Sequence, residues 1–244
     1  MILILFQTLQ KENKNSIEIS IIIPTINESK NLPLLLSDLS EITQEAEVLI
    51  IDSISKDKTK DIALNYGAKY FQTKERNRGL QLNFGAERAN GKWLLFIHAD
   101  SRLNKSWSKE VKKSIKSNAD LIYYFRFKVD NNKLIFRLLE IFVNLRCLFY
   151  KNPYGDQGIL ISKNQYNVMG GFNKLPIMED LDFISRIKRK DNLIQLKSII
   201  FTNSRKWDKI NIFTQSIKNW KLRREWKRGV STKSIYKAYY NNKN

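Results

Sequence analysis

The sequence is short of the residues that mark several protein classes. It has one cysteine, Cys147, and only nine glycines and four prolines among 244 residues. A single cysteine excludes an internal disulfide framework and fits a reducing compartment, and the small share of glycine and proline excludes fibrous and low-complexity classes. With 42% hydrophobic residues, a chain of this length can bury a full core. We therefore expect one cytoplasmic α/β domain with appendages.

Long apolar runs are also lacking. No stretch reaches the roughly 18 to 20 apolar residues that a transmembrane helix requires. The closest is 134–150, which is interrupted by charged residues at Arg137, Glu140 and Arg146. Residues 1–6 are apolar, but no basic leader precedes them and the run is too short for the core of a signal peptide. We expect neither secretion nor a membrane span.

Positive charge is what the sequence has in excess. A formal charge of +19 calls for an anionic partner, which is a nucleic acid, an acidic membrane surface or a phosphorylated substrate, although lysines on solvated faces account for part of it. From residue 205 to the end, twelve lysines and arginines alternate with tryptophans and tyrosines. Such a segment suits an anionic bilayer surface, single-stranded nucleic acid, or a helix that packs on the domain by its aromatic face.

Short apolar runs alternate with polar loops and helical patterns in the first half of the chain. Residues 17–23 are rich in β-branched side chains and stop at Pro24, which predicts a strand, and Thr25, Asn27 and Glu28 follow in the loop. The same reading predicts a series of further elements. The expected strands are 47–51, 69–72, 121–128 and 158–162, and the expected helices are 32–39, 59–66, 80–89, 106–116, 134–150 and 179–190.

The central strand is the apolar run 91–100, which ends abruptly in His98, Ala99 and Asp100. A run without polar alternation indicates a strand buried on both faces of a mainly parallel sheet. Ligands of such sheets lie beyond the carboxyl ends of the strands, where Asp52 is expected as well. The alternative is that Asp100 only turns the chain after its strand.

The order of these motifs resembles that of family 2 glycosyltransferases with the GT-A fold. The resemblance covers about residues 19–207. It rests on five segments in order, which are 22–28, 50–59, 96–101, 153–158, and 170–172 with 178–180. The His-Ala-Asp and Gly-Asp-Gln forms of two of them are similar to one bacterial subgroup. It implies an N-terminal extension (1–16), a GT-A domain (17–207) with a Rossmann-like sheet flanked by helices, and a basic, aromatic, helical tail (208–244).

The resemblance also implies roles for individual residues. Asp180 is the catalytic base, with Glu179 beside it, and Asp156 and Gln157 lie on the acceptor side. Asp100 binds Mg²⁺ or Mn²⁺, hard cations that prefer oxygen ligands. The residues expected to bind the nucleotide sugar are Pro24, Thr25, Glu28, Asp52, Arg76, Arg78, Ala99 and Asp100. Arg205 and Lys206 are further candidate contacts of the diphosphate.

Two positions depart from the family pattern. Ser53 and Ile54 stand in a loop that is usually rich in glycine, and the β-branched Ile54 restricts backbone angles that glycine allows. His98 replaces an acid of the metal motif, so it is either a second metal ligand or a hydrogen-bonding residue. A single remaining carboxylate implies weaker metal binding or a dispensable metal.

The sequence leads to one preferred function and two alternatives. The preferred one is an inverting glycosyltransferase that moves a sugar from a nucleotide diphosphate to a hydroxyl or carboxyl acceptor. The long apolar helix and the basic tail favour a lipid-like acceptor, of the polyprenol or carotenoid type, and peripheral contact with the anionic inner face of the cell membrane. The alternatives are a non-catalytic binder of nucleotide sugars and, with charge as its only support, a nucleic-acid-binding protein.

Overall fold

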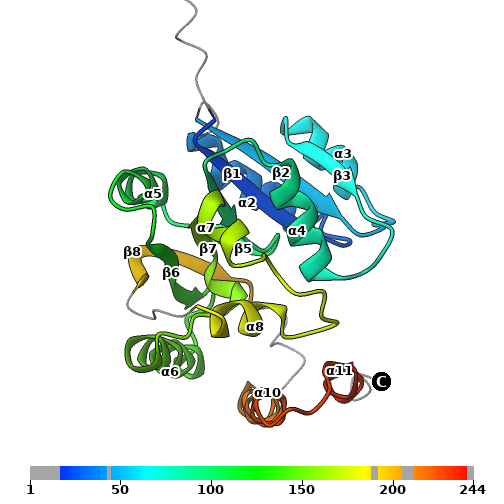
Figure 1. The fold of residues 1–244 in the computed structure, drawn as a ribbon, viewed down its shortest axis with the longest axis vertical. Helices are drawn as coiled ribbons and strands as arrows, with labels where there is room; N and C mark the ends of the chain where they lie inside the picture. Colours follow the sequence, from blue (N-terminus) through cyan, green and yellow to red (C-terminus); the bar gives the residue numbers. More distant parts are fainter. Residues whose placement is uncertain (1–16, 43–44, 188–191, 205–211, 241–244) are drawn as a thin grey trace, which may run out of the picture.

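The computed structural model describes residues 17–42, 45–187, 192–204 and 212–240 (Figure 1). In this part of the chain one sheet has the strand order β3-β2-β1-β4-β7-β6-β8-β5. Its strands are β1 (Ile19–Thr25), β2 (Ala46–Asp52), β3 (Lys69–Gln72), β4 (Trp93–Phe96), β5 (Ser101–Leu103), β6 (Ile122–Val129), β7 (Ile159–Ser162) and β8 (Leu193–Thr202). Strands β3, β2, β1 and β4 are parallel, whereas β7 is antiparallel to both of its neighbours. The predicted mixed, mainly parallel sheet is confirmed.

Helices cover both faces of this sheet, which explains the uniformly apolar strands. Within β1, Ile21 belongs to a core that includes side chains of α2, α3 and α5, whereas its neighbour Ile22 belongs to a core with side chains of α4, α7 and α8. The helices are α2 (Leu32–Leu39), α3 (Thr59–Asn65), α4 (Arg78–Arg88), α5 (Trp107–Ile115), α6 (Leu134–Tyr150), α7 (Lys163–Val168), α8 (Glu179–Ser185), α10 (Ile212–Lys227) and α11 (Thr232–Tyr240).

Three of these elements were not predicted from the sequence. They are the strands β5 and β8 and the helix α7. Strand β5 has only three residues, and β8 mixes polar with apolar positions. Both depend on distant partners, since β8 pairs with β6 on one side and with β5 on the other. Local pattern is a weak signal for such strands, because their stability comes from cross-strand packing.

The C-terminal helices α10 and α11 pack against α8. Leu222 of α10 and Ile235 of α11 are buried in one cluster with Met178 and with Leu181 of α8. In Figure 1, α10 and α11 lie together at the lower edge of the molecule, below α8. Part of the aromatic and basic tail is therefore joined to the domain by apolar contact. The division of the chain at residue 207 stays a prediction.

Candidate active site

A pocket of about 270 Å³ opens beyond the carboxyl ends of β1 and β4, where the sequence predicted a donor site. Most residues expected to bind the nucleotide sugar line it. They are Pro24, Thr25, Glu28, Arg76, Arg78, Ala99 and Asp100, and the pocket also includes His98 and Glu179. Two side-chain hydrogen bonds of Gln81, from Nε2 to the carbonyl oxygens of Ile51 (2.6 Å) and Thr25 (3.1 Å), tie the ends of β2 and β1 together behind it.

Asp52 is fully buried and is not among the residues that line this pocket. Its Oδ1 accepts a hydrogen bond from the Thr25 hydroxyl (2.9 Å), and its Oδ2 accepts one from the Ser55 backbone N–H (2.8 Å). Asp52 therefore holds Thr25, which does line the pocket, and shapes the loop that follows β2. Its expected contact with the base or ribose stays a prediction.

Ile54, in the same loop, takes up a backbone conformation that suits glycine. Its φ is +58°. Its side chain is 51% exposed, so burial of the side chain contributes little free energy to offset the backbone strain. The left-handed region costs a residue with a side chain about 1–2 kcal/mol, and β-branched residues are poorly suited to it. The departure noted in the sequence thus leaves a strained position at the edge of the loop.

We expect Ile54→Gly to raise the free energy of unfolding by about 0.5–1 kcal/mol, because relief of strain exceeds the extra entropy of glycine in the unfolded chain. Urea denaturation measures this. Lys56→Gly is the control: Lys56 is exposed and its φ is not positive, so glycine relieves no strain there and should lower the free energy of unfolding. A lower denaturation midpoint for Ile54→Gly than for the parent protein would contradict the strain at residue 54.

Asp100, 7% exposed, lines the pocket from the turn between β4 and β5. The described residues contain no group of three His, Cys, Asp or Glu side chains able to hold a metal ion alone. Mg²⁺ and Mn²⁺ at phosphate sites are commonly held by one or two carboxylates, with substrate phosphates and waters completing the octahedron. Asp100, with arginines in the same pocket, fits an ion that is held jointly with a diphosphate.

Arg78 and Glu179 form an ion pair between the first turns of α4 and α8. Glu179 is 2% exposed, whereas the Arg78 side chain reaches the pocket. Burial raises the pKa of Glu179; the Arg78 charge opposes the rise, and the neighbouring Asp180 adds to it. Burial lowers the pKa of Arg78, but the charges of Glu179 and Asp180 outweigh it and raise the value. The pair therefore keeps a fixed cation at the pocket wall.

Asp180 faces a second pocket, which we call the acceptor-side pocket. Its carboxylate accepts backbone hydrogen bonds from Gly155 (2.8 Å, Oδ2) and from Leu181 (2.8 Å, Oδ1). Asp156 lines the same pocket, and both His98 and Arg78 line this pocket and the donor-side one. The structure thus brings Asp180 and Asp156 together on one side of His98, with Asp100 on the other.

Gly155 brings three parts of the site together. A Cβ added at this position would lie 3.2 Å from Oδ2 of Asp180 and 3.2 Å from Nε2 of His98. Both side chains therefore pack directly over the Gly155 backbone, and His98 is placed beside the acceptor-side carboxylate. Its role as a metal ligand stays a prediction.

We expect Gly155→Ala to lower kcat by about tenfold with a change in stability below about 1 kcal/mol. The added methyl group would lie closer to Asp180 and His98 than an ordinary van der Waals contact, so both side chains must shift by a few tenths of an ångström. Small displacements of reacting groups lower the rate. Steady-state kinetics together with a thermal melt measure both quantities. Gly67→Ala, after α3 and outside both pockets, is the control for the added methyl group: nothing lies within 4 Å of it, so kcat should stay unchanged although its φ of +74° costs some stability. Unchanged kcat in Gly155→Ala would contradict the close packing.

Gln157, predicted on the acceptor side, is fully buried and does not line the acceptor-side pocket. Its Oε1 accepts hydrogen bonds from Arg146 (Nη2, 3.0 Å) and from the Tyr154 backbone (3.2 Å). The Tyr154 ring in turn contacts two arginines, with the guanidinium carbon 3.4 Å from the ring centroid for Arg146 and 5.0 Å for Arg223. Gln157 therefore shapes the loop that presents Tyr154 and Asp156.

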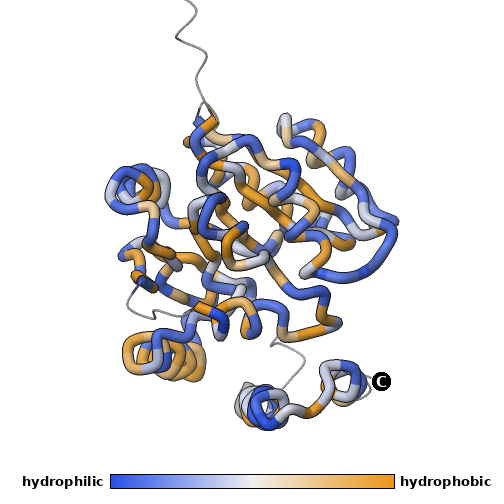
Figure 2. Tube along the Cα trace, in the orientation of Figure 1, coloured by the Kyte–Doolittle hydropathy of each residue, from blue (hydrophilic) through white to orange (hydrophobic). Residues whose placement is uncertain are grey.

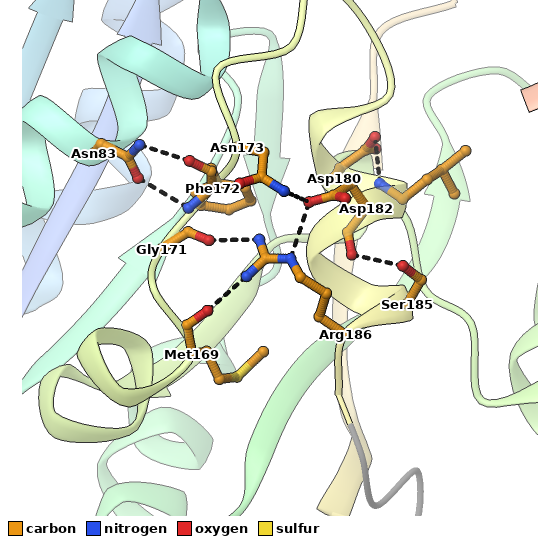
Figure 3. A network of polar contacts seen from close by, with 10 residues as sticks. Asn83, Met169, Gly171, Phe172, Asn173, Asp180, Asp182, Ser185 and Arg186 are labelled. Atoms are coloured by element: carbon orange, nitrogen blue, oxygen red, sulfur yellow. Dashed lines mark hydrogen bonds and ion pairs between the residues drawn. The ribbon is translucent and has the colours of Figure 1, made fainter. Parts of the chain in front are cut away.

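The turn before α8 is braced from two sides (Figure 3). Asn83 of α4 donates to the Phe172 carbonyl (2.7 Å) and accepts from its N–H (2.9 Å). Arg186 donates to the carbonyl oxygens of Met169 (2.6 Å) and Gly171 (2.5 Å). These bonds fix the entry into α8, and with it the position of Asp180.

Sequence reasoning missed several residues of the site. Arg223 of α10 lines the acceptor-side pocket, and three tyrosines of α11, Tyr236, Tyr239 and Tyr240, line the donor-side pocket. Only the alternation of basic and aromatic residues drew attention to this segment, and nothing in it pointed to the site. Arg205 and Lys206 lie outside the described residues.

Comparison with known proteins gives matches in both sequence and structure. The model of the family "Glycosyl transferase family 2" matches residues 20–175. A 4,4'-diaponeurosporenoate glycosyltransferase of Staphylococcus haemolyticus is 33% identical over 108 residues, which are 41% of this chain and 29% of that protein. A PGL/p-HBAD biosynthesis glycosyltransferase of Mycobacterium bovis is 30% identical over 175 residues, 67% of each chain.

Solved structures share the fold at lower identity. Crystalline S. aureus TarS in complex with UDP-GlcNAc superposes with a TM-score of 0.63 and 20% identity, over 77% of this chain and 59% of that one. Glucosyl-3-phosphoglycerate synthase from Mycobacterium tuberculosis, in complex with Mn²⁺ and UDP, has a TM-score of 0.54 and 16% identity, over 78% and 71%. The fold is thus that of GT-A glycosyltransferases, and the family match over most of the sheet shows that the chain belongs to glycosyl transferase family 2.

Proposed function

We propose that the protein is an inverting glycosyltransferase that moves a sugar from a nucleotide diphosphate to a lipid-like acceptor. The observation that carries the proposal is the meeting of two pockets at His98 and Arg78. One pocket holds Asp100 and arginines, which suit a diphosphate, and the other holds Asp180, which suits a base. A donor in the first pocket would present its sugar toward the second.

The donor side supplies charge for the leaving group. Arg76 and Arg78 line the pocket, and Glu179 keeps Arg78 in place, so a diphosphate would meet fixed cations. Asp100 would hold Mg²⁺ or Mn²⁺ there together with phosphate oxygens. When bound, such an ion neutralises the charge that develops on the departing diphosphate.

The acceptor side supplies the base. An acceptor oxygen attacks the anomeric carbon from the face opposite the diphosphate, and the bond between that carbon and the diphosphate oxygen breaks as the new one forms. The diphosphate leaves with the electron pair, Asp180 takes the proton of an acceptor hydroxyl, and the configuration at the anomeric carbon inverts. The two backbone N–H groups that Asp180 accepts from hold its carboxylate in one orientation.

The name of one relative supports a lipid-like acceptor. It is a glycosyltransferase of 4,4'-diaponeurosporenoate, a carotenoid-type acid. We infer that this protein likewise acts on an amphiphilic molecule, and that it does so at the inner face of the cell membrane.

A transfer assay tests the proposed function. The full chain is incubated with Mn²⁺, bacterial lipid extract and radiolabelled UDP-, GDP-, CDP- or TDP-sugars, and label is counted in the organic phase. We expect one nucleotide to support transfer, with inverted configuration of the lipid-linked sugar by NMR. Binding of a nucleotide sugar without release of nucleoside diphosphate would favour the non-catalytic binder of nucleotide sugars. Salt-sensitive binding of nucleic acid, with no binding of any nucleotide sugar, would favour a nucleic-acid-binding protein.

A further inference from the structure

Helix α6 carries exposed apolar residues along its length, which we call the stripe, and its trace is mostly coloured as hydrophobic in Figure 2. Its exposed side chains are between 40% and 75% accessible. They recur every three or four residues, so they share one face of the helix. They are Leu134, Ile135, Leu138, Ile141, Phe142, Leu145, Leu148, Phe149 and Tyr150.

The opposite side of α6 packs against the sheet, so the helix cannot rotate to bury the stripe in the core. Phe136 is buried against Phe127 and Val129 of β6. Glu140 accepts a hydrogen bond from the Val129 backbone N–H (2.7 Å) and pairs with Arg137 (2.8 Å). Monomeric proteins rarely expose a contiguous apolar patch of this kind unless it is an interaction surface.

Basic side chains are exposed on the neighbouring helix α10. Lys221, Arg224, Lys227 and Arg228, on or next to α10, are all exposed, and Trp220 among them is 52% exposed. Figure 1 shows α10 and α6 at the same lower end of the molecule. Among the described residues no helix has the length and apolar character to cross a bilayer. The combination of an apolar helix face and flanking cations is typical of segments that lie in the interface of an anionic membrane.

A cavity of about 700 Å³ lies between the two helices. It is lined by Arg146 and Tyr150 from α6 and by residues of α10 that include Trp220 and Lys227. It shares Tyr154, Leu181 and Arg223 with the acceptor-side pocket that contains Asp180. The C-terminal end of the stripe, at Tyr150, therefore lies next to a path that leads toward the proposed base.

We propose that the outer face of α6 and the exposed cations of α10 form a membrane-docking surface whose occupant is an anionic bilayer. Charge decides between a bilayer and a second copy of the chain. Each copy carries +19, so pairing through α6 would bring two cationic flanks together, whereas acidic headgroups neutralise them. The proposed docking is inferred from the apolar and basic residues of the surface alone. Only the delivery of a lipid acceptor through the cavity rests on the proposed function.

Vesicle flotation tests the apolar part of this surface. The full chain is mixed with vesicles of phosphatidylglycerol and phosphatidylcholine in equal parts, and with phosphatidylcholine alone. We expect flotation with the anionic vesicles, and about tenfold weaker partitioning for the double variant Phe142→Ser/Phe149→Ser. The matched control, Leu64→Ser/Val168→Ser, removes exposed apolar side chains from other helices and should float like the parent protein. Thermal melts verify that both variants are folded.

Charge reversal tests the basic part. Lys221→Glu/Lys227→Glu should weaken binding to anionic vesicles about tenfold or more, since each basic residue near the surface contributes about 1 kcal/mol. Lys105→Glu/Lys109→Glu makes the same change in net charge at exposed positions near the start of α5 and should have a much smaller effect.

Two results would overturn the docking surface. One is equal flotation of the Phe142→Ser/Phe149→Ser variant and the parent protein. The other is a stable dimer of the parent protein that the same variant dissociates, which would make the stripe a contact between copies. Release of nucleoside diphosphate without vesicles is measured in parallel and should be the same in this variant, so a failure of docking and a failure of the proposed activity are told apart.

Discussion

Asp180→Asn is expected to lower kcat for sugar transfer by about 10³-fold while donor affinity stays within about twofold. General base catalysis contributes about 10² to 10⁴ to a rate, and asparagine keeps the shape of the side chain but takes up no proton. The proposed donor site is the donor-side pocket on the other side of His98, so binding of the donor should not depend on this carboxylate.

Single-turnover kinetics and calorimetric titration of the donor separate the two effects. Asp61→Asn is the matched control, because Asp61 is an exposed aspartate of α3 outside both pockets, and it should retain full activity. If Asp180→Asn kept more than about a tenth of the parental kcat with a hydroxyl acceptor, Asp180 would not be the base.

Arg78→Leu is expected to destabilise the fold by about 3 kcal/mol, the lower end of the range for breaking a buried ion pair, because the Arg78 side chain is itself 41% exposed. The substitution leaves the carboxylate of Glu179, which is 2% exposed, without its partner charge. Arg88→Leu removes an arginine whose ion pair is with the exposed Glu87, and should cost much less. Denaturant unfolding of both variants measures the difference.

The pH dependence of Arg78→Leu follows from the raised pKa of Glu179. A carboxyl group whose pKa is higher in the folded state than its ordinary value of 4.5 binds its proton more tightly when folded, so stability falls as pH rises above that value. Without Arg78 the rise is larger, because the cation that opposed it is gone. The cost of the substitution should therefore be greatest near neutral pH and shrink as pH falls toward 4.5. A cost that does not change with pH would show that Glu179 is not the group left unpaired.

Local pattern placed the donor-side pocket at the carboxyl edge of the parallel strands, and the family resemblance supplied the residues expected in it. The strands before Pro24 and Asp100 have apolar runs that end abruptly in the sequence. Because parallel strands end at one edge of the sheet, residues far apart in the chain could be placed together. The expected helix at 32–39 also has these bounds in the structure.

Contacts between distant residues were not predictable in the same way. The burial of Asp52 depends on Thr25 and Ser55, and the burial of Gln157 depends on its contacts with Arg146 and Tyr154. The sequence shows which side chains can form hydrogen bonds. It does not show which of them bond to other protein groups and are therefore not available to a ligand. For the same reason nothing in the tail indicated that its tyrosines and Arg223 would line the two pockets.

The most direct test of a metal-dependent donor site is calorimetric titration of nucleoside diphosphates and their sugars into the parent protein and into Asp100→Asn, each with Mn²⁺ and with a chelator. We predict that one nucleoside diphosphate binds the parent protein in the presence of Mn²⁺. Chelation or Asp100→Asn should weaken this binding about tenfold or more, since Asp100 is the proposed metal-binding carboxylate among those that line the pocket. No binding of any of these compounds to the parent protein, with or without metal, would contradict the proposed donor site.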